Sequence, residues 1–338
     1  MSLLDSALTP SAIVRHLDQY VIGQDEAKRI LAVAVYAHYK KIARSQVDGL
    51  ETTKSNVLLV GPTGTGKTLM CESLARLLKV PFVTADATSL AQSRYVNDEI
   101  EAILERLHDK AEGDLVRTQQ GIVFIDEIDK LRTAADVSIR GQSGESVQHA
   151  LLKIMEGAPV RLRSGQYLDT TNVLFICGGA FVGLDAIMSQ SHGFGFVATS
   201  DDDNQKILTR LNARVKPTDL VEFGLIPEFT GRLAIVARFQ DLSRDMLVRI
   251  MTEPRNCIYR QFQAILKAEG VELVVAPRAF GEIADLAIEY KSGARSLRGL
   301  FEELITPVLY AIPDHPEVRR VELASIFVEP RYFRAPPS

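Results

Sequence analysis

The amino-acid sequence predicts an α/β protein, with a parallel sheet covered by helices and a smaller, mainly helical α+β domain after it. Between residues 56 and 179, short apolar runs alternate with amphipathic helical segments, which is the pattern of a parallel sheet buried on both faces. After residue 238 the pattern changes to helical segments with only short β-like pieces between them. The length of 338 residues is too great for one ordinary domain and suits two.

The individual elements follow from apolar periodicity and from capping signals. Thr9 is expected to cap a first helix with Pro10 at its first position, and a break at 20–24 separates it from a second helix. Strands are predicted at 56–60, 81–86, 121–126 and 172–179, helices at 67–78, 97–111 and 144–157, and a hairpin at 160–170. The helix at 97–111 is expected to have Asn97 as its N-cap. Beyond residue 238, helices are expected within 245–270, 276–290 and 296–312, and β-like pieces at 271–275 and 318–323.

These elements divide the chain into three predicted parts. Residues 1–55 form N-terminal helices of the large domain, 56–238 its core, and 239–338 the small domain, with a hinge near 238–245.

Composition excludes several classes of protein. The formal charge is 39 − 43 = −4, less basic than is usual for a protein that binds duplex DNA. The three cysteines, Cys71, Cys177 and Cys257, are far apart in apolar runs, so we expect buried thiols in a reducing compartment rather than a zinc site. The N-terminus has no signal-peptide pattern and no run approaches a membrane span, so a cytoplasmic protein is expected.

The stretch "GPTGTGKT", from Gly61 to Thr68, fits the phosphate-binding pattern G-x-x-x-x-G-K-[ST]. A predicted strand precedes it and a predicted helix follows, which is the context the pattern requires. Its glycines allow backbone N–H groups to surround phosphates, and the helix N-terminus adds partial positive charge. Lys67 is expected to reach the β- and γ-phosphates and Thr68 to bind Mg²⁺.

A second signal is "IVFIDEID", an apolar strand that ends in Asp126 and Glu127. Acidic residues at the carboxyl end of a parallel strand lie at the ligand edge of the sheet. Asp126 is expected to hold Mg²⁺, and Glu127 to act as the general base for the attacking water. Together the two motifs predict nucleoside triphosphate hydrolysis, without saying what it drives.

Long blocks of the chain resemble the ClpX-type AAA+ protein unfoldases, from about Thr9 to the end of the small domain. They include "HLDQYVIGQDEAKRILAVAVYAHYKKI", "VPFVTADATSLAQSRYV", "GESVQHALLKIMEG", "VLFICGGAFVGLD", "DLVEFGLIPEFTGRL" and "SGARSLRGLFEE". The resemblance implies an AAA+ P-loop NTPase that forms a homo-hexameric ring. With ATP and Mg²⁺ as cofactors, the ring would thread polypeptides through its pore, with or without a ClpP-like peptidase.

The resemblance also implies roles for individual residues. Val21 and Ile22 match the adenine-contacting pair, Arg232 the arginine finger that reaches a neighbouring subunit's nucleotide, and Arg295 the sensor-2 arginine. The residues implied to contact the nucleotide phosphates are Gly61, Pro62, Thr63, Gly64, Thr65, Gly66, Lys67, Thr68 and Leu69.

The implied pore loop differs from the family pattern. Typical members have Gly-Tyr-Val-Gly where this chain has Arg94, Tyr95, Val96 and Asn97. Loss of two glycines removes backbone freedom, and Arg94 would add one positive charge per subunit. We therefore predict a stiffer pore loop that favours acidic or polar substrate segments, with Tyr95 and Val96 facing the polypeptide.

Other departures concern partners. Three scattered cysteines cannot form the four-cysteine zinc domain usual at the N-terminus of the family. The insertion that bears an Arg-Lys-His triplet in typical members here has only Arg161 and Arg163. Phe194, Gly195 and Phe196 match the peptidase-docking tripeptide most closely, and two phenylalanines on an exposed loop suit docking or packing onto their own domain equally. The "ICGG" stretch offers no sensor-1 side chain.

Two rival functions stay open from sequence alone. One is an AAA+ ATPase that remodels nucleic acid or protein complexes without any peptidase; the acidic balance and the aromatic pore residue count against nucleic acid. The other is a nucleotide-gated scaffold that hydrolyses little ATP. The intact set of Lys67, Asp126, Glu127 and Arg232 counts against it.

Overall fold

The computed structural model describes residues 8–48, 54–93, 95–132, 144–191 and 214–334. The chain divides into two compact units. The first contains Met1–Val14, Asp25–Pro62 and Met70–Phe239, and the second contains Arg15–Gln24, Thr63–Leu69 and Gln240–Ser338. Two short N-terminal segments are thus grouped with the C-terminal part of the chain.

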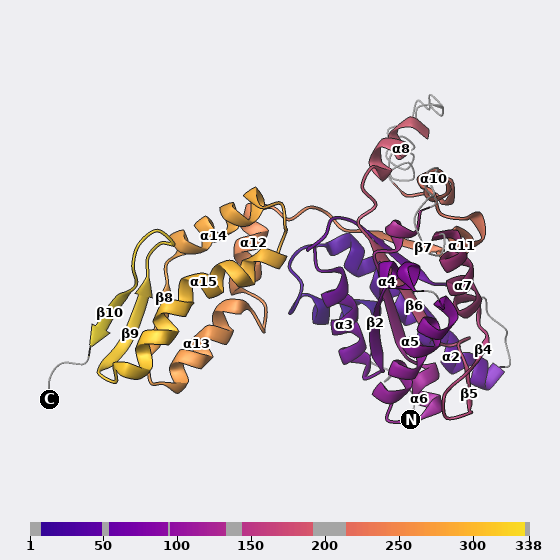
Figure 1. Ribbon diagram of the computed structural model, residues 1–338, viewed down its shortest axis with the longest axis horizontal. Coiled ribbons are helices and arrows are strands. Elements are labelled where there is room, and N and C mark those ends of the chain that lie inside the picture. Colours follow the sequence, from indigo (N-terminus) through magenta and orange to yellow (C-terminus); the bar gives the residue numbers. More distant parts are fainter. Residues whose placement is uncertain (1–7, 49–53, 94, 133–143, 192–213, 335–338) are drawn as a thin grey trace. The chain divides into compact units, whose positions relative to one another are not determined.

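The first unit is built on a five-stranded parallel sheet with strand order β2-β3-β6-β1-β7 (Figure 1). Its strands are β1 (Val57–Val60), β2 (Phe82–Asp86), β3 (Ile122–Asp126), β6 (Leu174–Gly179) and β7 (Ile235–Arg238). The central strands β1 and β6 are buried along their whole length, as a sheet covered on both faces requires. The predicted sheet is confirmed, and each predicted strand lies within two residues of an observed one. Strand β7 was not predicted.

Helices and one hairpin surround this sheet. Helix α5 packs on β2 and on α7, and α2 packs on β7. The two-stranded hairpin β4–β5 confirms the predicted insertion. The remaining bounds are α1 (Pro10–Leu17), α2 (Asp25–Asp48), α3 (Lys67–Leu78), α4 (Ala87–Gln92), α5 (Val96–Lys110), α6 (Leu115–Gln119), η1 (Ile128–Leu131), α7 (Gly144–Glu156), β4 (Pro159–Arg161), β5 (Tyr167–Asp169), α8 (Leu184–Ser191), α10 (Pro217–Phe223) and α11 (Pro227–Arg232).

The predicted caps have different outcomes. Thr9 caps α1 as expected, because its hydroxyl accepts the N–H of Ala12 at 3.2 Å and Pro10 is the first helical residue. The Asn97 prediction was wrong: α5 begins at Val96, and Tyr95 is the N-cap without a side-chain cap bond. The reason is tertiary, since Val96 is buried in the core and the N-cap lies two residues earlier than predicted.

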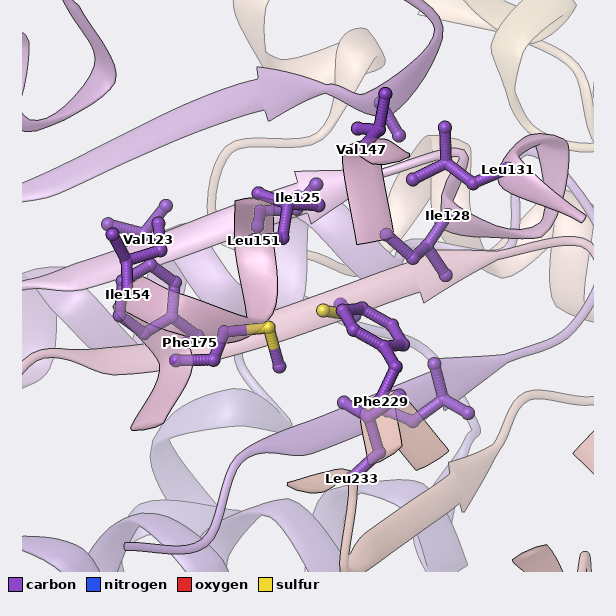
Figure 2. Close-up of a cluster of buried hydrophobic side chains, with 14 of the residues drawn as sticks. Val123, Ile125, Ile128, Leu131, Val147, Leu151, Ile154, Phe175, Phe229 and Leu233 are labelled. Carbon is purple, nitrogen blue, oxygen red and sulfur yellow. The ribbon is translucent and has the colours of Figure 1, made fainter. Parts of the chain in front are cut away.

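One part of the core of the first unit lies between the sheet and the helices α7 and α11 (Figure 2). It joins side chains from β3, β6, η1, α7 and α11; those labelled are Val123, Ile125, Ile128, Leu131, Val147, Leu151, Ile154, Phe175, Phe229 and Leu233. Because such interiors are close-packed, the turn after β3 and the end of α11 are held against a rigid support. Cys71, Cys177 and Cys257 are all buried free thiols, as predicted.

The second unit has its own core and its own sheet. Strand β8 (Glu272–Val275) runs parallel to β9 (Val318–Leu323), and β10 (Arg331–Arg334) is antiparallel to β9. The helices are α12 (Arg244–Thr252), α13 (Ile258–Ala268), α14 (Pro277–Glu289), α15 (Arg295–Ala311) and η3 (Ile312–Asp314). Stacked rings of Phe262, Phe280 and Phe301 form the centre of this core, and the mainly helical α+β prediction is confirmed. Among the described residues of the chain, no helix has the length and apolar character of a membrane span.

Candidate nucleotide site

The predicted phosphate loop joins β1 to α3, which begins at Lys67. At two positions of this loop only glycine fits, because a side chain would clash with neighbouring backbone. A Cβ on Gly61 would lie 2.4 Å from the Phe239 carbonyl oxygen, and a Cβ on Gly64, at φ +79°, would lie 2.6 Å from the Ser292 carbonyl oxygen. Lys67, the first residue of α3, is only 7% exposed, so its side chain does not extend into solvent. The loop therefore has the tight backbone curvature that a bound phosphate requires.

Within the second unit, the loop contacts two segments that are distant in sequence. The Gly64 carbonyl accepts the N–H of Ala294 at 3.2 Å. On the other side, the Val21 side chain lies 3.7 Å from the position that a Cβ on Gly66 would take. The second unit therefore brings together the segment with Val21 and Ile22, the phosphate loop, and the start of α15.

The Val21–Ile22 segment is held in a fixed conformation. Both side chains are buried, and the two residues that follow, Gly23 and Gln24, have positive φ values of 65° and 60°. The strained Gln24 is held by a reciprocal pair of hydrogen bonds: its amide donates to the Gln240 carbonyl at 2.9 Å and accepts the Gln240 N–H at 2.8 Å. An apolar pair held so close to a phosphate loop suits contact with a nucleotide base.

Arg295 is the first residue of α15 and is exposed. It follows directly after Ala294, whose N–H binds the phosphate loop. The predicted sensor residue and the loop therefore belong to one compact unit, and Arg295 is one residue away from a direct contact with that loop.

The acidic residues lie at the carboxyl edge of the sheet in the first unit. Asp126 ends β3, which pairs with β6, and β6 in turn pairs with β1, whose end leads into Gly61. Glu127 adopts a left-handed conformation with φ 58°, which lets its N–H donate to Asp126 Oδ1 at 2.9 Å. One oxygen of Asp126 is thereby oriented by the backbone of its neighbour.

Asp129 is a residue of this edge that the sequence interpretation missed. It is 5% exposed, and its carboxylate accepts the N–H groups of Ala180 and Phe181 at 3.2 and 3.3 Å. A Cβ on Gly178 would lie 3.3 Å from Asp126 Oδ1, and one on Gly179 would lie 2.6 Å from Asp129 Oδ1. The backbone at the end of β6 can therefore lie close to both carboxylates because Gly178 and Gly179 have no side chain. The available signal was the third acidic residue of "DEID" together with the paired glycines.

The residues present suit Mg²⁺ held jointly with nucleotide phosphates. No cluster of three or more His, Cys, Asp or Glu side chains exists in the described part of the chain, so a metal cage made of protein alone is absent there. The second carboxylate oxygen of Asp126 has no hydrogen-bond partner among the described residues. A carboxylate and the Thr68 hydroxyl are hard oxygen ligands, and Mg²⁺ usually combines one or two such ligands with phosphate oxygens and water.

Arg232 ends α11 on the surface of the first unit, 39% exposed. Its guanidinium pairs with Glu156, at the end of α7, with Nη2 and Oε1 separated by 2.6 Å. Its carbonyl accepts both the backbone N–H and the side-chain amide of Asn56, each at 3.3 Å. The backbone of this arginine is thus fixed while its cationic end stays at the surface, as a residue that acts on another subunit requires.

The predicted pore residues separate in the structure. Tyr95 is 70% exposed at the start of α5, whereas Val96 is 5% exposed and belongs to the core. The expectation that both face a polypeptide is therefore corrected for Val96. Arg94 and the tripeptide 194–196 lie outside the described residues. Arg161 and Arg163 are exposed on the β4–β5 hairpin.

Comparisons with known proteins identify the family of the chain. Residues 52–236 match the family model described as the AAA domain (Cdc48 subfamily), and residues 242–322 match the C-terminal, D2-small domain of ClpB protein. The chain is 44% identical to the ATP-dependent Clp protease ATP-binding subunit ClpX 3 of Methylococcus capsulatus, over 92% of this chain and 78% of that protein. It is 46% identical to the ClpX subunit of Treponema denticola over 90% and 77%, and 45% identical to that of Azotobacter vinelandii over 92% and 76%. The chain therefore belongs to the ClpX family of ATP-binding subunits of ATP-dependent Clp proteases and is an AAA+ ATPase of that type.

Proposed function

We propose that this chain is an ATP-driven unfoldase that pulls polypeptides through the pore of a homo-hexameric ring and delivers them to a ClpP-like peptidase. The observation that supports it best is Tyr95, a large ring that is 70% exposed on a firmly packed helix in a chain with an intact ATPase site. An apolar ring grips a polypeptide through its surface without reading its sequence. Acidic composition favours a protein substrate over a nucleic acid.

The nucleotide is bound by residues from the loop and from the segment before α2. Val21 and Ile22 would contact the base, and Lys67 would bind the β- and γ-phosphates. Thr68 and Asp126 would hold Mg²⁺, which when bound neutralises charge on the transferring phosphoryl group. The other contacts assigned to the loop are Gly61, Pro62, Thr63, Gly64, Thr65, Gly66 and Leu69.

Asp126 and Glu127 take different parts in hydrolysis because their backbones differ. The Glu127 N–H fixes the Asp126 carboxylate as a ligand. Glu127 follows in a left-handed turn, and its carboxylate would accept a proton from the attacking water. Asp129 supports both by holding the end of β6 beside β3.

Two arginines would stabilise the charge that develops during transfer. Arg295, beside the phosphate loop in the second unit, would act on the nucleotide of its own subunit. Arg232 would act on that of a neighbour, so that hydrolysis depends on ring assembly. In the isolated chain Glu156 holds the Arg232 guanidinium, and this exposed pairing is weak enough to be exchanged for a phosphate.

The pore loop and the docking loop complete the proposal. Arg94 beside Tyr95 would place six positive charges in the pore of a hexamer and favour acidic segments. Phe194, Gly195 and Phe196 would present an aromatic anchor to the peptidase.

The test compares ATPase rates with unfolded protein, with folded protein and with single-stranded DNA. We expect stimulation by protein and complete loss in Glu127→Gln, together with ATP-dependent unfolding of a tagged fluorescent substrate. Stimulation by DNA alone would overturn the proposal, and turnover too slow to separate Glu127→Gln from wild type would favour a scaffold. Capture of a ClpP-like peptidase by wild type but not by Phe196→Ala tests the docking loop separately.

A further inference from the structure

A small cavity of about 80 Å³ opens in the first unit, away from the residues assigned to the nucleotide. Its walls come from α2, from the segment that precedes β1, from the turn between β5 and β6, and from β7. It lies at the amino end of β1, whereas the phosphate loop follows the carboxyl end of the same strand. We call it the α2–β1 pocket. Its polar lining residues are His38, Lys41, Lys54, Ser55, Thr171 and Asn172.

Lys54 lines this pocket, and few groups around it offset the positive charge of its protonated form. Its Nζ donates to the Thr170 carbonyl at 2.7 Å and lies 4.5 Å from the centre of the Phe175 ring. Burial lowers the pKa of Lys54 to about 7, and the charge of Asp169 opposes that change. No carboxylate among the described residues forms an ion pair with it. A buried ammonium with neutral partners is costly, and an anion beside it would remove most of that cost.

His38 adds a second basic group from α2. It is 8% exposed, and its Nε2 lies 3.0 Å from the Asn172 carbonyl oxygen. Because a carbonyl oxygen only accepts, Nε2 must hold a proton and the ring must be oriented by this bond. Burial lowers the pKa of His38 to about 4, and the positive charges of Lys54 and Lys41 act in the same direction. Three basic side chains from two elements therefore converge on one cavity.

The pocket also contains hydrogen-bond donors that remain available. Within the described residues, neither the Ser55 hydroxyl nor the Asn172 side-chain amide has a hydrogen-bond partner. Asp169, the one carboxylate that acts on Lys54, is exposed, and its Oδ1 already accepts the N–H and the hydroxyl of Thr171 at 2.9 and 2.6 Å. Around Lys54, the Ser55 hydroxyl and the Asn172 amide are therefore donors without an acceptor in the described part of the chain.

We propose that the α2–β1 pocket binds a small inorganic oxyanion of the sulfate or phosphate type, held by Lys54 and Lys41 and by hydrogen bonds from Ser55 and Asn172. Its volume of about 80 Å³ equals that of two or three waters at about 30 Å³ each, which is enough for one such ion. Because the ligands come from α2, from the segment before β1 and from the β5–β6 turn, the bound ion would tie these elements together and stabilise the first unit.

The test uses sulfate as the probe, because it does not titrate near neutral pH. The full chain is saturated with ADP so that the phosphate loop is occupied, and sulfate replaces chloride at constant ionic strength. Lysine acetylation is then followed residue by residue by mass spectrometry. At ten times its half-protecting concentration, sulfate should slow acetylation of Lys54 about tenfold. Lys40, which lies over the exposed side of α2 near Tyr36, should react at an unchanged rate.

Thermal unfolding provides the second readout. Sulfate should raise the melting temperature of wild type and of the matched control Lys40→Gln, and should leave that of Lys54→Gln unchanged. A rise of equal size in Lys54→Gln would place the anion elsewhere and overturn the proposal. The proposal would also be overturned if sulfate left the acetylation rate of Lys54 in wild type unchanged. This measurement does not depend on the folding of any variant. If sulfate slowed acetylation of Lys40 as much as that of Lys54, the effect would be general electrostatic screening, which would count against a specific site.

Discussion

Acidification should destabilise the first unit through His38, by an amount that follows from its burial. The imidazole of this α2 residue is buried and donates to the Asn172 carbonyl, and burial lowers its pKa from 6.5 to about 4. Below pH 6.5 the unfolded chain binds a proton at this residue, and the folded chain does not until about pH 4. Stability is therefore fully present above pH 6.5 and is lost as the pH falls toward 4.

The two pKa values set the size of the effect. At pH 5 the protonated unfolded chain gains about 2 kcal/mol over the folded one, since each pH unit below the pKa of the unfolded chain adds about 1.4 kcal/mol until the folded chain also binds the proton. The charged groups that face the ring are Lys41 on α2 and Lys54 before β1, with Asp169 acting on Lys54. They are present in wild type and variant alike, so a comparison isolates His38.

The assay is urea unfolding, followed by circular dichroism at pH 7 and at pH 5, at one protein concentration. Between these pH values, wild type should lose about 2 kcal/mol more than His38→Gln, which keeps a donor for the Asn172 carbonyl but cannot titrate. His149→Gln, which removes an exposed imidazole from α7, is the matched control and should behave as wild type. Equal losses in wild type and His38→Gln would refute the assignment of a buried, neutral histidine.

Three further predictions concern the ATPase and the pore. Gly64→Ala should weaken ATP binding at least about tenfold in an equilibrium titration, because its Cβ would meet the Ser292 carbonyl. Gly113→Ala has a similar φ and open space around it, so it should cost only about 1 kcal/mol of stability; equal effects on ATP binding would contradict the steric reason. Glu127→Gln should lower kcat about 100-fold or more while ATP still binds, and unchanged turnover would remove it as the base. Tyr95→Ala should retain ATP hydrolysis and lose substrate unfolding, measured by loss of substrate fluorescence; normal unfolding would exclude the ring from the grip.

The local apolar pattern was sufficient to predict those elements that are apolar along their own sequence. The apolar runs that became β1, β3 and β6 are buried almost throughout, and the phosphate loop is dictated by its glycines. Strand β7 was missed because its identity depends on pairing with β1, a partner about 175 residues away. Strand β10 was missed because all four of its residues are exposed, so it has no alternating burial to detect.

The site residues show the same limit. Asn97 is the better N-cap by intrinsic preference, but burial of Val96 outweighs that preference and moves the helix start. Asp129 resembled one more solvated acid after Asp126, and only the return of β6 beside β3 buries it. The contact between Gly64 and Ala294 joins positions 230 residues apart, which no local pattern can indicate.

The start of α5 has a mechanical consequence. The Tyr95 carbonyl, not its side chain, accepts the N–H groups of Asp98 and Glu99, so the ring has no part in holding the helix. Val96 and the apolar face of α5 pack this helix, which has 15 residues and is about 22 Å long, against β2 and α7. We expect a force applied to the ring to be passed through this packed helix to the sheet. The Tyr95 side chain, which we propose to contact the substrate, can therefore be replaced at little structural cost, whereas the packed helix that follows it must stay intact.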